Sequence, residues 1–309
     1  MAFLRGFGSW LPPRRVNNQE LAPLVDATPE WILEVSGIEE RRYAADTDTV
    51  GGIGLLAAKD CLDKAGATAA ELGMILVASG SSDRFCPGPA SQIAAGLGLG
   101  STAALDIPVS SAGSLIGLAL ASQLASAAGR VLVVGTEIMS RRVTLSPEGK
   151  STAILFGDGA GAALVDAENG FARIADSCMY TDGASSETLF MRDGQFYMDG
   201  SAVILHASRK MPRAINELLA RNQIAAADVE AFLLHQANLN LISRVAAAMK
   251  TPLERFFTNI DRYGNTSSAS LLIAADEWRG GQSGALTGPL VFSAFGSGLN
   301  WGALLALPG

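Results

Sequence analysis

Short apolar runs alternate along the chain with longer segments that have a helical pattern. The runs at residues 74–77, 103–107 and 130–134 are rich in Val, Ile, Leu and Ala, and we expect them to be strands. Between the last two, residues 112–128 are apolar almost all round, contain no proline and precede Gly129, which predicts a buried helix that ends there. Apolar strands that alternate with helices are typical of an α/β fold whose sheet is covered on both faces.

The second half of the chain repeats features of the first. Helices are expected at residues 53–65 and 214–221, and each leads into a similar segment. AAELGMILVASG begins at Ala69, and AADVEAFLLHQA begins at Ala226, 157 residues later. Such an echo at a fixed offset indicates an internal repeat.

Two further segments recur in the same order. SSAGSLI begins at Ser110 and SSASLLI begins at Ser267, again 157 residues later, while FGDGAGAAL returns as FGSGLNWGALL at a shorter distance. These echoes predict a duplicated fold, and we place its halves at residues 1–166 and 167–309. Ligands of open α/β sheets bind at the carboxyl ends of strands, so we expect the chemistry where the two halves bring such ends together.

The composition narrows the class of protein. Of the 309 residues, 49% are hydrophobic and 17% are charged, so the chain can bury a large core. The formal net charge of −7 argues against nucleic acid as a partner, because binding to phosphates needs a positive field. The N-terminus has no signal-peptide pattern and no unbroken apolar run reaches membrane-spanning length, so we expect a soluble cytoplasmic protein that does not bind a membrane.

The cysteines and histidines give no sign of a metal site. Cys61, Cys86 and Cys178 lie far apart, without the spacing of a zinc site or a disulfide framework, which suits a reducing cytoplasm. The only histidines are His206 and His235. No motif surrounds His206, and we expect it on a helix surface or in the core.

Three segments place reactive side chains where a strand meets a helix. They are LDIPVSSAG, which ends at Gly113, LLHQANLNLI around His235, and RYGNTSSAS around Asn265. A nucleophile at the start of a helix lies in the positive end of the helix dipole, which stabilises an anion or a developing oxyanion. His235 and Asn265 are both hydrogen-bond donors and are suited to holding a carbonyl oxygen.

These motifs together resemble those of the β-ketoacyl-acyl-carrier-protein synthase III family of the thiolase superfamily. The resemblance covers almost the whole chain: GSWLP near the N-terminus, EWI, SGIEER, the SSAG turn, FGDGAGAA, HQANL, GNTS and FGSGLNWG. It implies a thiolase fold, in which two pseudo-twofold halves build five layers, α-β-α-β-α. It also implies a homodimer.

The resemblance implies an acyltransferase that moves an acyl group from acyl-coenzyme A to the enzyme and condenses it with malonyl on an acyl carrier protein. Ser111 stands at the nucleophile position, and His235 and Asn265 would hold the second thioester carbonyl. The backbone amides of Ser111 and Ser297 would form the acyl oxyanion hole. No permanently bound cofactor is expected, since acyl-coenzyme A is the substrate.

The chain departs from the family pattern at the nucleophile itself. Asp106 and the Ala112-Gly113 pair place Ser111, and not Ser110, where the family usually has cysteine. A hydroxyl needs a base, and His235 is the one nearby candidate. Three readings stay open: a native serine enzyme that forms an oxygen ester, a cysteine-to-serine replacement that traps a bound state, and a non-catalytic acyl-thioester-binding subunit of a synthase complex.

The substrate contacts implied by the family are only partly present. Trp31 matches a tryptophan beside the adenine of coenzyme A, but Val35 stands where the family has an arginine. Lys150 and Arg141 are the basic residues expected near the phosphates.

The acyl pocket and the docking site for the carrier protein also differ. Phe85 lies one residue before the position of the aromatic that closes the partner's acyl pocket, and Cys86 occupies that position. Asn240 replaces a basic carrier-docking residue, which Arg244 could substitute from one turn later. A serine hydrolase is disfavoured, because GxSxG is absent and no acidic third member can be placed.

Overall fold

Ten strands pair side by side in the computed structural model, which describes residues 1–309. Their bounds are β1 (Phe3–Trp10), β4 (Met74–Ala78), β5 (Ala103–Ile107), β6 (Arg130–Ile138), β7 (Asp158–Asp166), β8 (Ala172–Thr181), β11 (Ala231–Leu234), β12 (Phe256–Phe257), β13 (Leu290–Gly296) and β14 (Asn300–Pro308). Their order is β12-β11-β13-β14-β8-β1-β7-β6-β4-β5. β1 and β8 share only two residue pairs, so the strands form two five-stranded sheets joined at one corner.

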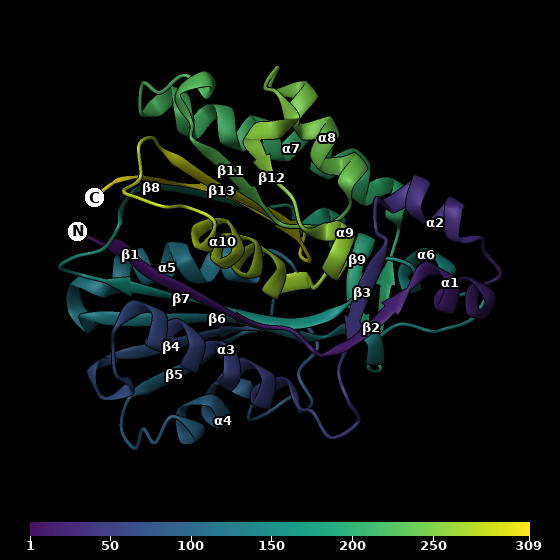
Figure 1. Cartoon of the computed structure of the whole chain (residues 1–309), viewed down its shortest axis with the longest axis horizontal. Coiled ribbons are helices and arrows are strands. Elements are labelled where there is room, and N and C mark those ends of the chain that lie inside the picture. The colour runs from purple at the N-terminus through teal and green to yellow at the C-terminus, as the bar shows by residue number, and fades with distance from the viewer.

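Helices form three layers around these two sheets (Figure 1). The outer face of the first sheet is covered by α3 (Val50–Ala65) and α4 (Pro89–Gly96), and that of the second by α7 (Gly200–Arg221) and α8 (Leu239–Ala248). Between the sheets lie α5 (Gly113–Ala128) and α10 (Ser270–Gly280). The five layers of the thiolase fold expected from the sequence are therefore confirmed.

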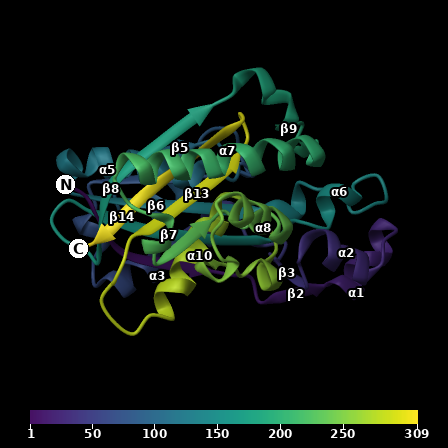
Figure 2. The same cartoon turned by 90° about the horizontal axis from the view of Figure 1, so that it is seen from above.

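The smaller elements gather at the end of the molecule opposite the two termini (Figures 1 and 2). They are the strand pair β2 (Arg14–Asn17) and β3 (Glu40–Tyr43), the hairpin β9 (Leu189–Arg192) and β10 (Gln195–Met198), and the helices α1 (Asn18–Leu21), α2 (Pro29–Ser36), α6 (Lys150–Ala153) and α9 (Ile260–Tyr263). Of these, α2 lies against the segment that follows β11, where Asn238 Nδ2 donates to the carbonyl of Val35 at 2.8 Å.

The same elements recur in the two halves at the offset found in the sequence. α5 begins at Gly113 and α10 at Ser270, 157 residues later, and β4 and β11 begin at Met74 and Ala231, at the same separation. The predicted dividing point at residue 166 coincides with the last residue of β7. The assignment of residues 1–166 and 167–309 as separate domains stays a prediction.

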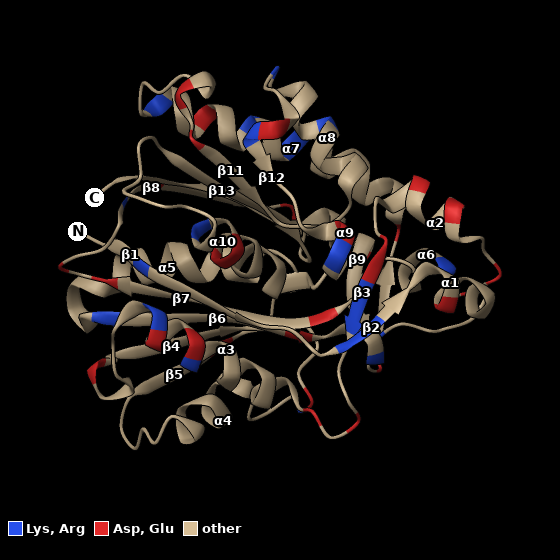
Figure 3. Ribbon diagram, in the orientation of Figure 1, with Lys and Arg blue, Asp and Glu red and all other residues tan.

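Apolar side chains fill the spaces between the layers. One cluster joins both sheets through α5 and α10 and includes Leu118, Leu271 and Phe292. Of two more clusters, one lies beneath the outer helices of the first sheet and the other beneath those of the second. α5 carries no charged residue, and its buried apolar side chains belong to the cluster that joins both sheets (Figure 3). No helix in the chain combines the length and apolar character needed to cross a membrane.

Two expectations about single elements were wrong in part. β5 was expected to be covered on both faces, but it is the edge strand of the first sheet, and Leu105 is 53% exposed. α7 begins at Gly200, fourteen residues before its expected start, and continues through Pro212. Proline normally ends or kinks a helix, which concealed the first half of α7 in the sequence.

Candidate active site

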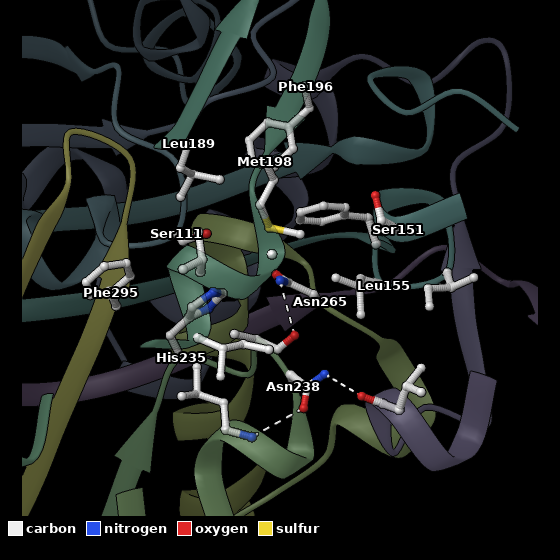
Figure 4. A pocket seen from close by; sticks show the side chains of 18 of the residues that line it. Ser111, Ser151, Leu155, Leu189, Phe196, Met198, His235, Asn238, Asn265 and Phe295 are labelled. Carbon is white, nitrogen blue, oxygen red and sulfur yellow. Dashed lines mark hydrogen bonds between the residues drawn. The ribbon is translucent and has the colours of Figure 1, made fainter. Parts of the chain in front are cut away.

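An apolar pocket of about 230 Å³ brings the three sequence motifs together (Figure 4). Ser111, His235 and Asn265 all line it, and Figure 4 shows their side chains close to one another. Most of the remaining lining is hydrophobic and comes from the β9–β10 hairpin, the first turns of α7 and the segment around Phe156. Trp31 and Val35 of α2 also line it. The pocket is therefore suited to an extended apolar group that ends at three polar side chains.

Ser111 occupies a strained turn directly before α5. Its φ is +66°, a left-handed conformation that is uncommon for a residue with a side chain. The turn places Ser111 two residues before Gly113, the first residue of α5, whose first turns are mostly buried while Leu120 is exposed. The hydroxyl therefore lies at the positive end of the α5 dipole and faces the pocket.

His235 follows β11 and is held from both sides. Its backbone N–H donates to the carbonyl of Ser293 at 2.9 Å, and Nδ1 lies 2.5 Å from the hydroxyl oxygen of Ser270. Burial lowers the pKa of His235 to about 3, because the charged imidazolium would lose its hydration. The ring is therefore neutral at physiological pH.

Asn265 is oriented by the residue two positions later. Its Oδ1 accepts the backbone N–H of Ser267 at 2.8 Å, which turns Nδ2 away from that contact. Nδ2 makes one long hydrogen bond, 3.4 Å, to the carbonyl of Ala237. An amide nitrogen has two protons, so a second donor remains for a ligand in the pocket.

A buried carboxylate ties the two halves together beneath these groups. Glu137, at the end of β6, is fully buried and accepts hydrogen bonds from the backbone of Gly80 and Ser81 in the first half and from the Ser267 hydroxyl in the second. The oxygen of that hydroxyl accepts the backbone N–H of Ser111 at 3.0 Å. Glu137 thus holds the turn at Ser111 through one intermediate residue.

The two amides expected to form an oxyanion hole both have protein partners. The Ser111 amide donates to Ser267, and the Ser297 amide donates to the carbonyl of Ser110 at 3.2 Å. Each amide would have to release its partner oxygen to bind an acyl oxygen.

The chain is similar to known proteins along almost its whole length. Residues 105–183 match the family model described as 3-oxoacyl-[acyl-carrier-protein] synthase III, and residues 219–307 match the model of its C-terminal part. The β-ketoacyl-[acyl-carrier-protein] synthase III of Oleidesulfovibrio alaskensis is 36% identical over 98% of each chain. The chain belongs to the synthase III family.

Solved synthase III structures share the whole fold. The enzyme from Aquifex aeolicus superposes with a TM-score of 0.95 at 32% identity, over 99% of this chain and 100% of that one. The enzyme from Pseudomonas aeruginosa gives 0.90 at 34% identity, over 99% and 98%. The likeness therefore extends to the insertions that surround the pocket.

Of the synthase III residues expected to contact coenzyme A, the structure brings two together. Trp31 is 37% exposed and lines the pocket, and the ammonium of Lys150 lies 4.9 Å from the centre of its ring. Arg141 does not line the pocket. Its guanidinium donates to the carbonyls of Ala45 and Asp48 at 2.6 and 2.9 Å. These bonds fix a loop outside the pocket lining, and a contact of Arg141 with the phosphates stays a prediction.

Phe85 and Cys86 do not line the pocket of their own chain. Both are exposed, on the loop that precedes α4, and Phe85 projects fully into solvent. Asn240 donates to the backbone carbonyl of Glu34 at 2.9 Å, so it ties α8 to α2. Arg244 is exposed on the same helix.

Sequence reasoning missed three polar residues of the synthase III site: Glu137, Ser267 and Ser270. Ser267 and Ser270 belong to the SSAS segment, which the internal repeat singles out without indicating a chemical role. Glu137 lies near the end of β6 in a mostly apolar run, and a glutamate at such a place was a usable signal, because an isolated buried carboxylate is rare.

Proposed function

We propose that this protein transfers an acyl group from acyl-coenzyme A to Ser111 and condenses it with malonyl carried by an acyl carrier protein. The observation that carries the proposal is the convergence of Ser111, His235 and Asn265 on one apolar pocket. The pathway would be fatty acid biosynthesis or a related secondary-metabolite route in the cytoplasm.

The chemistry divides into two steps. In the first, Ser111 Oγ attacks the thioester carbonyl, a C–O bond replaces the C–S bond, and the coenzyme A thiol leaves with a proton. In the second, malonyl loses carbon dioxide and the freed electron pair forms a carbon nucleophile, which attacks the acyl ester. The new C–C bond replaces the C–O bond, and the Ser111 oxygen leaves and takes a proton from water. His235 and Asn265 would donate hydrogen bonds to the malonyl thioester oxygen while charge develops there. The Ser111 and Ser297 amides would bind the acyl oxygen after exchanging their present partners.

Substrate binding would combine apolar burial with contacts at the pocket rim. The acyl group and the pantetheine arm would lie along the apolar lining, and Trp31 would stack on the adenine. Lys150 would contribute a positive charge near the phosphates, although without the bidentate geometry of arginine. The carrier protein would dock near α8, where Arg244 is the available basic residue.

Acyl loading is the first test of this function. After incubation with acyl-coenzyme A, we expect intact-mass measurement to detect one acyl group per chain in the parent protein and none in Ser111→Ala. Ser110→Ala is the matched control, because Ser110 is equally buried but does not line the pocket, and this variant should load normally. Absence of any adduct across short, medium and long acyl chains would favour the non-catalytic binding subunit.

We further propose a homodimer formed through the edge of the first sheet. β5 has no neighbour on its outer side, its Leu105 is exposed, and the Phe85 loop lies beside it, since Gly88 approaches the side chain of Asp106. An exposed apolar edge strand is a ready surface for pairing with a second copy. The partner's Phe85 loop would then reach the acyl pocket.

The dimer has a direct test in solution. At micromolar concentration we expect light scattering to give twice the mass of the chain. Leu105→Glu should shift the protein to monomer, because a carboxylate would have to be buried in the interface. Leu253→Glu is the control, since Leu253 is also an exposed leucine but lies in the C-terminal half, and it should remain dimeric. A monomeric parent protein would refute the assembly.

A further inference from the structure

Ser270 is the buried group beside His235 that has no role in the chemistry described so far. It is the first residue of α10, is 2% exposed and lies outside the lining of the pocket. Its hydroxyl oxygen makes two hydrogen bonds, one with Nδ1 of His235 at 2.5 Å and one with the backbone N–H of Gln236 at 3.1 Å. The imidazole is therefore turned so that Nδ1 meets Ser270 and Nε2 is the nitrogen left for the pocket.

The protons of this contact can be assigned by counting donors and acceptors. A serine hydroxyl has one proton and two lone pairs. The Gln236 N–H is a donor and occupies one lone pair of Ser270, so Nδ1 is the acceptor available to the hydroxyl proton. If Nδ1 carried a proton, Ser270 would receive two donors and its own proton would be buried without an acceptor, which is unfavourable.

We propose that Ser270 donates its hydroxyl proton to Nδ1 of His235 and thereby holds the imidazole as the tautomer protonated on Nε2. Ser270 is then a positioning residue. The Nε2–H group faces the pocket as a hydrogen-bond donor, and Nε2 has no lone pair with which to accept the proton of Ser111. Burial, which keeps the His235 ring neutral, supports a single fixed tautomer.

The tautomer can be read without any enzymatic activity. The chain has only two histidines, and His206 lies in α7 outside the pocket, so His206→Gln leaves the His235 ring as the sole imidazole signal. In the full-length protein with ¹⁵N-labelled histidine, we expect the NMR pattern of a neutral ring protonated on Nε2 between about pH 6 and 8. A pattern protonated on Nδ1, or an even mixture, would overturn the proposal.

Variants of Ser270 test its part in fixing the tautomer. Ser270→Ala should give a mixed tautomer pattern and lower the condensation rate by about 10-fold, while Ser270→Thr, which keeps the hydroxyl, should preserve both. Ser268→Ala is the matched control: Ser268 is also buried in this segment, but its hydroxyl donates to the carbonyl of Val109. If Ser270→Ala lowered thermal stability and left the Nε2–H pattern intact, Ser270 would be only structural.

Only the predicted effect of Ser270→Ala on the condensation rate rests on the proposed function. The assigned tautomer and the proposed function can therefore fail separately. An Nε2–H pattern in a protein that forms no acyl adduct would reject the acyltransferase and leave the role of Ser270 standing. Acyl loading together with an Nδ1–H pattern would support the acyltransferase and reject the role of Ser270.

Discussion

Ser111→Cys is expected to raise the rate of acylation by acyl-coenzyme A by about 100-fold or more. A thiol has a pKa near 8.5, so about a few per cent is thiolate at pH 7, and the α5 dipole increases that fraction. A serine hydroxyl instead needs a base at the moment of attack. If Ser270 holds His235 protonated on Nε2, the base nearest to Ser111 is blocked and the parent protein should acylate slowly. Mass spectrometry over time, with the same acyl-coenzyme A, measures both rates.

The neighbouring serine supplies the control for this change. Ser110→Cys places a thiol one residue earlier, outside the pocket lining, and should load no faster than the parent protein. Removing the imidazole with His235→Ala should leave loading of the cysteine variant nearly unchanged. If Ser111→Cys gained nothing and His235→Ala abolished loading of the parent protein, His235 would be the general base of a native serine enzyme.

Asn265→Ala is expected to lower decarboxylative condensation by about 100-fold while acyl loading stays close to that of the parent protein. The reason is that the free Nδ2 proton would stabilise charge on the malonyl thioester, which enters only in the second step. Loading is measured by intact mass, and condensation by release of carbon dioxide from malonyl on the carrier protein. An equal loss in both steps would reject this role.

Asn265→Asp separates the donor from the contact that orients the side chain. Aspartate keeps an oxygen for the Ser267 N–H, which Asn265 accepts at 2.8 Å, but it loses the Nδ2 protons. Condensation should therefore fall at least as far as in Asn265→Ala. A rate near that of the parent protein would mean that Asn265 serves chiefly to hold Ser267.

Elements with a simple periodic pattern were predictable almost to the residue. The helix expected at residues 112–128 is α5 (Gly113–Ala128), and the strand expected at residues 103–107 is β5. α7 was predictable only beyond Pro212, because local propensity excludes proline from a helix interior whereas tertiary packing buries it there. The exposure of β5 could not be read either, since an apolar edge strand and a central strand have the same sequence pattern.

The residues of the site were also predictable only in part. Ser111, His235 and Asn265 lie in short motifs, so their meeting in one pocket could be expected from a duplicated sheet. The contact between Ser270 and Nδ1 of His235 joins residues 35 positions apart and depends on how α10 packs beside β11. The partners of Arg141 could not be read from the sequence either, because its guanidinium donates to backbone carbonyls of a loop almost a hundred residues earlier.

The position of β1 constrains the order in which the chain can fold during synthesis. β1 comprises Phe3–Trp10, yet its main partner is β7, which ends at Asp166, and it joins the second sheet through Ala172 and Arg173 of β8. β1 must therefore wait, as an unpaired strand, until β7 and the start of β8 have been made. Contacts of such long sequence separation slow folding and leave strand edges open to aggregation. β1 is thus made well before the strands that complete its pairing.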